Sequence, residues 1–186
     1  MFSKFLKSFG ANKKIKYTDN FYKDFFDNFG GKQFGEGLLN TIRLEDTGKW
    51  KEYLVDAFSR LEGKILPFGY TWDGIFFSID IRDGKMIICD AGASQCFALP
   101  VSLKDFLNEY LSDRSADFLN AAEYRQWKSV NGPVPYGFCA GWRIPLFLNG
   151  KDDMENRELC DMEVYWGITG QIRQQVMGDD YGQDEG

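Results

Sequence analysis

The sequence predicts an α+β fold in which amphipathic helices pack on a central, mostly antiparallel sheet. Three observations lead to this prediction. Apolar residues repeat at helical spacing in the first and last thirds of the chain, the period changes to two in the middle, and the turn sequence Asp83-Gly84 divides that middle segment. With 186 residues, 44% of them hydrophobic, the chain can form one well-packed domain or two small parts that share a core.

The N-terminal third predicts two helices separated by a short strand. Thr18 or Asp19 can cap the first helix, a strand is expected over 38–42, and Asp46 or Thr47 can start the second helix. The apolar residues of the first helix are Phe21, Tyr22, Phe25, Phe26 and Phe29. Those of the second helix are Trp50, Tyr53, Leu54, Ala57, Phe58 and Leu61. Both helices therefore have a broad side to bury.

The middle of the chain predicts a hairpin and meander over residues 64–99. Segments 75–82 and 85–91 flank Asp83-Gly84, a strong signal for a two-residue type I′ turn. The pairs expected across this loop are Ile81 with Met86, Ile79 with Ile88, and Phe77 with Asp90. A third strand is expected over 96–99, where Pro100 would end it.

The C-terminal half predicts further helices and one more strand. Residues 102–105 carry a capping-box signature ahead of a short amphipathic helix, and a longer helix is expected over about 115–130. The apolar run 144–148 reads as a strand that joins the sheet. Residues 159–166 fit either a strand or a helix capped by Asp161, and the helix is favoured because its apolar spacing continues to residue 176.

The charge distribution favours a basic protein partner over a nucleic acid. Residues 151–186 hold ten acidic and three basic residues, a net charge of −7, whereas the whole chain carries −6. Binding to phosphates draws its affinity from clustered Lys and Arg, so we expect no direct contact with nucleic acid. Acidic residues that only keep the surface soluble explain the charge equally well.

The cysteines and the apolar runs favour a cytoplasmic protein. Cys89, Cys96, Cys139 and Cys160 have no CxxC spacing, which is typical of reduced thiols rather than of a disulfide frame or a zinc site. No apolar run approaches the ~20 residues of a membrane span. The first ten residues lack the apolar region and cleavage site of a signal peptide. We expect no contact with a membrane, and the oligomeric state stays open.

The chain has no histidine, which excludes Ser-His-Asp and Cys-His catalysis and histidine-bound metal. Two catalytic alternatives remain for a small hydrolase or metal-binding enzyme. Cys139 has the glycine spacing of a nucleophile elbow, but no base accompanies it. The carboxylates of 152–163 follow neither EF-hand nor phosphate-loop spacing, so a solvated acidic loop is the default explanation. We therefore expect no catalytic residue, no metal ligand and no cofactor.

Loop aromatics and loop acids are the candidate partner-binding residues. Loop Trp and Tyr are frequent interface anchors, although closing the ends of the core explains each of them about as well. Three irregular segments, 70–74, 132–142 and 149–158, carry these residues and are expected to lie on one surface. The candidates are Tyr70, Trp72, Asp73, Tyr136, Trp142, Asp152, Asp153, Glu155 and Glu158.

Several segments resemble the immunity proteins of type VI secretion DNase toxins. Residues 145–156 (PLFLNGKDDMEN) and 161–166 (DMEVYW) are similar to the C-terminal domain of that family, and 68–74 and 100–106 are similar to its upstream motifs. The first third resembles the family's GAD-like domain. The division that this resemblance implies is a basic lead-in over 1–16, a GAD-like part over 17–95, an immunity-type part over 96–177 that shares its core, and an acidic tail over 178–186.

The resemblance implies an antitoxin without catalytic activity. A bacterial immunity protein of this kind is a DNase inhibitor that binds a cognate nuclease toxin in the cytoplasm and occludes its DNA-binding cleft. The acidic C-terminal third suits that role, because an enzyme that cleaves DNA presents a basic cleft. The alternatives are the enzyme described above and a regulatory adaptor that binds proteins without a toxin.

Overall fold

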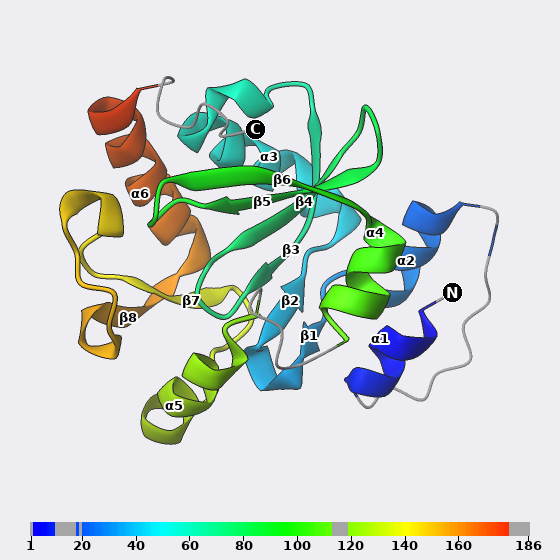
Figure 1. The fold of residues 1–186 in the computed structure, drawn as a ribbon, viewed down its shortest axis with the longest axis horizontal. Helices are drawn as coiled ribbons and strands as arrows, with labels where there is room; N and C mark the ends of the chain where they lie inside the picture. Colours follow the sequence, from blue (N-terminus) through cyan, green and yellow to red (C-terminus); the bar gives the residue numbers. More distant parts are fainter. Residues whose placement is uncertain (1, 10–17, 19, 113–118, 179–186) are drawn as a thin grey trace.

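A computed structural model describes residues 2–9, 18, 20–112 and 119–178. Its centre is a six-stranded sheet with strand order β1-β2-β3-β4-β5-β6 (Figure 1). The strands are β1 Gln33–Phe34, β2 Leu39–Thr41, β3 Ile65–Thr71, β4 Phe76–Asp80, β5 Lys85–Asp90 and β6 Gln95–Ser102. Each strand pairs antiparallel with the next along the chain, so the predicted α+β class and antiparallel meander are confirmed.

Helices cover both faces of this sheet. The α-helices are α1 Ser3–Ser8, α2 Phe21–Phe29, α3 Thr47–Ala57, α4 Leu103–Asp105, α5 Ala121–Asn131 and α6 Met162–Met177. The shorter helical turns are η1 Gly35–Gly37, η2 Leu44–Asp46, η3 Ser59–Leu61, η4 Phe106–Tyr110, η6 Leu146–Leu148 and η7 Met154–Asn156. On one face Phe25 of α2 packs on Phe68, and on the other Trp50 of α3 and Trp166 of α6 pack on Phe76. Figure 1 shows α1, α2 and α4 together on the right of the sheet and α6 on its left.

A β-bulge in β3 decides which aromatic faces which helix layer. The register with β4 shifts between Pro67 and Gly69, so Phe68 is the extra residue. Residues two apart in a regular strand share a face. Here Phe68 stacks on Phe77, whereas Tyr70 packs on Phe76, the neighbour that points to the opposite face. Proline has no N–H to donate to a neighbouring strand, which makes it compatible with a bulge.

The predicted two-residue hairpin loop is wrong, because β4 ends at Asp80 and β5 begins at Lys85, which leaves a loop over 81–84. Ile79, rather than Ile81, pairs with Met86, and the other two expected pairs are displaced by the same two residues. The Asp80 carboxylate accepts hydrogen bonds from the backbone N and the Nε of Arg82, both at 2.9 Å, which stabilises a wider turn. A shift of two residues leaves every side chain on its expected face.

The third strand of the meander is longer than predicted. β6 continues past Pro100 to Ser102, which is possible because β6 is an edge strand and leaves one side of its backbone unpaired. Ser102 then caps the following helix by accepting a hydrogen bond from the Asp105 backbone N at 3.2 Å. The N-cap that the capping-box signature predicts is confirmed.

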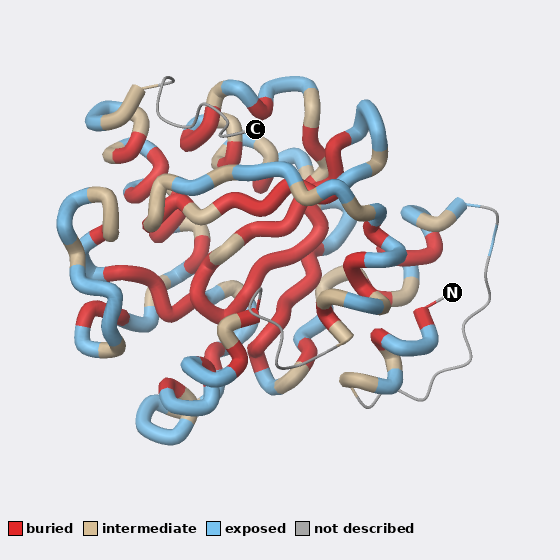
Figure 2. The backbone as a smooth tube through the Cα atoms, in the orientation of Figure 1, coloured by how far each residue is buried: buried red, intermediate tan, exposed pale blue. Residues whose placement is uncertain are grey.

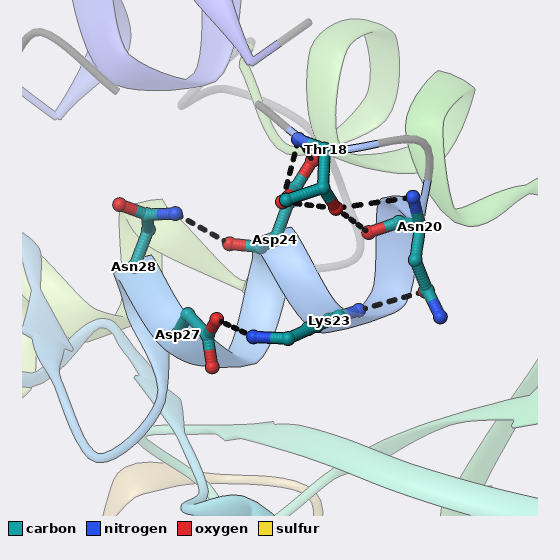
Figure 3. Close-up of polar contacts among 6 residues, drawn as sticks. All are labelled: Thr18, Asn20, Lys23, Asp24, Asp27 and Asn28. Carbon is teal, nitrogen blue, oxygen red and sulfur yellow. Dashed lines mark hydrogen bonds and ion pairs between the residues drawn. The ribbon is translucent and has the colours of Figure 1, made fainter. Parts of the chain in front are cut away.

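The start of α2 differs from the prediction (Figure 3). Asn20 is the N-cap, because its side chain accepts a hydrogen bond from the Lys23 backbone N at 3.0 Å. Thr18 lies further upstream, and its backbone N and hydroxyl donate to the buried Asp24 carboxylate at 2.8 and 2.9 Å. Asp19, the other expected cap, lies outside the described residues.

The strand predicted over 144–148 is absent. Residues Leu146–Leu148 form the single turn η6 instead, bounded by Pro145 and by Asn149 in a left-handed conformation with φ 63°. Pro145 has no N–H, and the left-handed turn ends any extended run at that point. A separate two-stranded sheet forms on either side of this loop, from β7 Phe138–Trp142 and β8 Arg157–Asp161.

The last helix agrees with the favoured prediction. Asp161 caps α6, because its side chain accepts hydrogen bonds from the backbone N of Glu163 at 2.9 Å and of Val164 at 3.1 Å. The helix expected over about 115–130 is α5, which begins at Ala121; residues 113–118 lie outside the described part.

One core runs through both expected parts of the chain. β6 completes the sheet that the first part begins, and α6 packs on α3. The buried backbone continues from the central strands into β7 (Figure 2). Within the lead-in, Phe2, which precedes α1, and Phe5 of α1 are buried. Residues 10–16 of the lead-in and 179–186 of the tail lie outside the described residues. Within the described ranges, no helix has the length and apolar character that crossing a membrane requires.

Candidate functional site

The candidate site lies at the end of the β7–β8 hairpin. A backbone hydrogen bond from Ala140 N to the Trp72 carbonyl at 2.8 Å ties this hairpin to the end of β3, and one from Met162 N to the Gly137 carbonyl at 2.9 Å extends the pairing of its two strands. Across the two strands, Trp142 stands opposite Arg157. The loop 143–156 that joins them is therefore held at a defined position on the sheet.

Asn156 fixes the shape of that loop. Its buried side chain accepts a hydrogen bond from Ile144 N at 3.0 Å and donates to the carbonyls of Ile144 and Lys151, both at 2.8 Å. Asp153 accepts a further bond from the Asn156 backbone N at 3.0 Å. The close packing also requires Gly150, since a Cβ there would lie 1.9 Å from the Ile144 carbonyl oxygen. Residues 143–156 thus form a rigid loop.

This loop forms one wall of an acidic pocket with a volume of about 490 Å³. We call it the acidic pocket. The loop and two neighbouring elements, α5 and the β7–β8 hairpin, supply its walls. Its described lining residues are Glu123, Gln126, Trp142, Asp152, Asp153, Met154, Glu155 and Arg157. Four of these carry a carboxylate and one carries a positive charge.

The positive charge of Arg157 is already engaged. Its guanidinium lies 3.6 Å from the ring centre of Trp142 and 5.0 Å from that of Trp72. It also pairs with Asp73 at 3.7 Å and with Glu123 at 3.5 Å, and only 4% of its side chain is exposed. A buried and neutralised arginine leaves the acidic pocket with a negative potential towards the solvent.

A further ionisable group that interacts electrostatically with Arg157 and Asp73 stands at the end of β5. Burial raises the pKa of Asp90 to about 6, and the negative charge of Asp73 acts in the same direction. The Asp90 carboxylate accepts a hydrogen bond from Ala93 N at 3.0 Å in the turn that leads to β6. That turn also accepts a bond from the pocket loop, through Leu146 N and the Gly92 carbonyl at 2.8 Å.

Four of the nine expected partner-binding residues meet in the acidic pocket. They are Trp142, Asp152, Asp153 and Glu155. The side chain of Trp142 is largely buried, with 7% exposed, so it contributes a wall rather than a protruding anchor. The three irregular segments lie side by side, because Trp72 and Ala140 share a hydrogen bond and Arg157 pairs with Asp73. Residues 70–74 are buried, however, so the expectation of one shared surface is wrong for that segment.

Three expected residues are buried and do not reach the surface. Trp72 is fully buried, and its indole N–H donates to the Leu119 carbonyl at 3.1 Å. The Tyr70 hydroxyl accepts from Gly137 N at 2.8 Å, and Asp73 pairs with Arg157 inside the core. The expectation that these three residues contact a partner is corrected. They lie beside glycines because β3 has a bulge and a tight turn follows it, not because they belong to a surface loop.

The remaining two candidates lie on the surface away from the acidic pocket. Tyr136 is 40% exposed and donates its hydroxyl proton to the Thr41 carbonyl at 3.1 Å. Glu158 pairs with Arg143 at 3.3 Å. Sequence reasoning missed four lining residues of the acidic pocket: Glu123, Gln126, Met154 and Arg157. Arg157 alone carried a signal, as the one base within the acidic stretch 152–172.

The catalytic alternatives find little support in the geometry. Cys139 is fully buried in β7, and burial raises the pKa of its thiol well above the usual range. A thiol of that kind is neither accessible to substrate nor readily ionised. Within the described part of the chain, no group of three or more Cys, Asp and Glu side chains is arranged to hold a metal ion.

Comparison with known proteins identifies a fold but no family. No protein-family model matches the chain, and no curated protein matches it. The fold is similar to the crystal structure of Atu4351 from Agrobacterium tumefaciens, with a TM-score of 0.69 and 16% sequence identity over 92% of this chain and 89% of that one. A likeness at this identity shows the fold alone.

Proposed function

We propose that the protein is an immunity protein that binds and neutralises a basic protein, a nuclease toxin of the type VI secretion kind, without catalysing a reaction itself. The observation that carries this proposal is the acidic pocket, where four carboxylates surround Trp142 above an arginine that is already neutralised. A nuclease holds DNA in a basic cleft. A rigid acidic surface is complementary to such a cleft and occludes it when bound.

The pocket suits a Lys or Arg side chain of the partner. Carboxylates on α5 and on the pocket loop, Glu123 and Glu155 among them, can pair with a guanidinium or ammonium group, and Trp142 offers an apolar wall to the aliphatic stem. The loop is held by the Asn156 side chain, so binding requires little additional ordering of the backbone. We expect a cytoplasmic complex of one nuclease with this surface, without nucleic acid or membrane as direct partner.

The test first looks for a nuclease gene beside the gene for this protein, and the nuclease is then co-expressed and purified in inactive form. Asp152→Lys with Glu155→Lys reverses two exposed charges of the acidic pocket and spares Asp153, which caps η7. The matched control, Glu52→Lys with Asp56→Lys, makes the same charge change on exposed residues of α3. The pocket variant should associate about tenfold more slowly at low salt, with a difference that shrinks as salt rises. Equal association rates for the two variants would remove the acidic pocket from the mechanism.

The enzyme alternative is tested separately through Cys139. Cys139→Ala removes the only thiol that has nucleophile-elbow spacing and introduces no buried hydroxyl. The immunity function predicts that cells with this variant survive expression of the nuclease as well as cells with the wild type. Loss of protection by a folded variant that still binds the nuclease contradicts the proposal. If no nuclease binds, the adaptor alternative is favoured.

A further inference from the structure

Two cysteines meet across neighbouring strands at the edge of the main sheet. Cys89 of β5 and Cys96 of β6 are direct cross-strand partners, and their sulfur atoms lie 3.0 Å apart. Disulfide formation would bring these atoms to about 2.05 Å. The movement required is therefore about 1 Å, which side-chain rotation and a small strand adjustment can supply.

The two thiols differ in environment. Cys89 is fully buried, and burial raises its pKa well above the usual range. Cys96 is partly exposed, and the hydrogen bond from Cys89, assisted by the nearby Arg60 guanidinium, lowers its pKa. An accessible thiol that ionises readily is the one that reacts with an oxidant, and a second thiol beside it resolves the product.

Cys96 also opens to a small cavity of about 160 Å³. The charged residues that line it are Arg60, Lys64, Asp80 and Arg82. Three of these four carry positive charge, and the Arg60 guanidinium bonds to the Cys96 carbonyl. The positive charges stabilise a thiolate at Cys96, and the cavity admits a small molecule the size of hydrogen peroxide.

We propose that Cys89 and Cys96 form a peroxide-sensitive site that closes reversibly into a disulfide. In the first step the Cys96 thiolate attacks hydrogen peroxide: an S–O bond forms, the O–O bond breaks, and the hydroxide that leaves takes a proton to become water. In the second step Cys89 loses its proton and attacks the Cys96 sulfenic acid: the S–S bond forms, and the S–O bond breaks with release of a second water. Two thiols are oxidised and one peroxide is reduced, and a dithiol reductant reverses the reaction.

The other two cysteines provide an internal comparison. Cys139 and Cys160 are also direct cross-strand partners, in β7 and β8. Among the contacts of the described residues, no hydrogen bond joins their sulfurs, and the Cys160 thiol instead donates to the Glu158 carbonyl at 3.4 Å. Burial raises the pKa of both thiols, so this pair lacks a readily ionised member. Cross-strand position alone therefore does not make the site.

The test treats the reduced, full-length protein with a small excess of hydrogen peroxide at neutral pH. We expect two of the four thiols to be lost, the intact mass to fall by two hydrogens, a cross-linked peptide that joins Cys89 to Cys96, and full recovery with dithiothreitol. The control Cys139→Ala with Cys160→Ala should lose the same two thiols. Retention of all thiols under conditions that oxidise the unfolded chain, or a cross-link between Cys139 and Cys160, overturns the proposal.

Two single variants separate the steps. In Cys89→Ser, which keeps a hydrogen-bond donor beside Cys96, the reaction should stop at the Cys96 sulfenic acid, which dimedone traps as a stable adduct detectable by mass. Cys96→Ser, at the partly exposed position, should neither react with peroxide nor form the disulfide. Peroxide reactivity that persists in Cys96→Ser, or the absence of a dimedone adduct in a folded Cys89→Ser protein, contradicts the assignment of Cys96 as the attacking thiol.

Discussion

Replacement of Arg157 by Met is expected to destabilise the fold strongly. The side chain that replaces it has a similar length, but the carboxylate of Asp73, 2% exposed, is left without its cation. Removing one partner of a buried ion pair costs about 3–5 kcal/mol. Asp73 keeps hydrogen bonds from the Thr71 hydroxyl and from the Asn120 amide at 2.6 Å. Because these bonds still stabilise the carboxylate, we expect a loss of unfolding free energy near the lower end of that range. The lost contact with the Trp142 ring adds about 0.5–2 kcal/mol.

The measurement is urea unfolding followed by tryptophan fluorescence, at fixed pH and salt. Arg157→Met should lose about 3 kcal/mol or more of unfolding free energy, whereas Glu123→Gln, which removes the half-exposed partner, should lose less than about 1 kcal/mol. Asp73→Asn added to Arg157→Met removes the unpaired charge and should restore part of the loss. If Arg157→Met costs no more than Glu123→Gln, or if the double variant is no more stable than Arg157→Met, the account of a buried charge pair is wrong.

Three further predictions concern stability. The pKa of Asp90 is about 6 in the folded protein and about 3.9 in an unfolded chain, so protonation of Asp90 favours folding. The free energy of unfolding should therefore fall as pH rises from about 4 to about 6. In unfolding titrations Asp90→Asn should lack that fall. The Ser78 hydroxyl is buried without a hydrogen-bond partner, so Ser78→Ala should leave the melting temperature unchanged or raise it, and a clear loss would show that the hydroxyl has a partner. Gly150→Ala should lose about 1–3 kcal/mol, because its Cβ would meet the Ile144 carbonyl at 1.9 Å, whereas Gly48→Ala, with no atom within 4 Å of its Cβ in α3, should gain up to about 1 kcal/mol. Similar effects in the two glycine variants would contradict the close packing of the pocket loop.

Local signals in the sequence predicted the elements that local interactions determine. The helices α3 and α6 have apolar spacing and a residue suited to capping, and in α6 the Asp161 cap decided correctly between helix and strand. The segment 144–148 failed because its shape depends on hydrogen bonds to Asn156, a residue further along the chain. The apolar residues and the proline of this segment do not indicate that Asn156 will bind its backbone.

The candidate site was predictable only in part, for a similar reason. The acids Asp152, Asp153 and Glu155 stand in a polar, turn-rich stretch, so their exposure followed from the sequence. Glu123 belongs to α5, which contributes to the pocket through the docking of distant elements. Trp72 has glycine and other turn-forming neighbours like those of a surface loop, yet it is buried because β7 and the segment before α5 cover it.

The bulge at Phe68 fixes how the two halves of β3 align with β4. Loops such as 81–84 can accept an inserted or deleted residue, because both strands beside them keep their alternation. Straightening β3 without removing a residue would instead slide one half of the strand by one residue along β4 and turn that half over. Phe68 would then leave the layer of α2, or Tyr70 would leave that of α3. Proteins that share this fold and keep both aromatics should therefore vary in length at their turns while keeping the bulge in this strand.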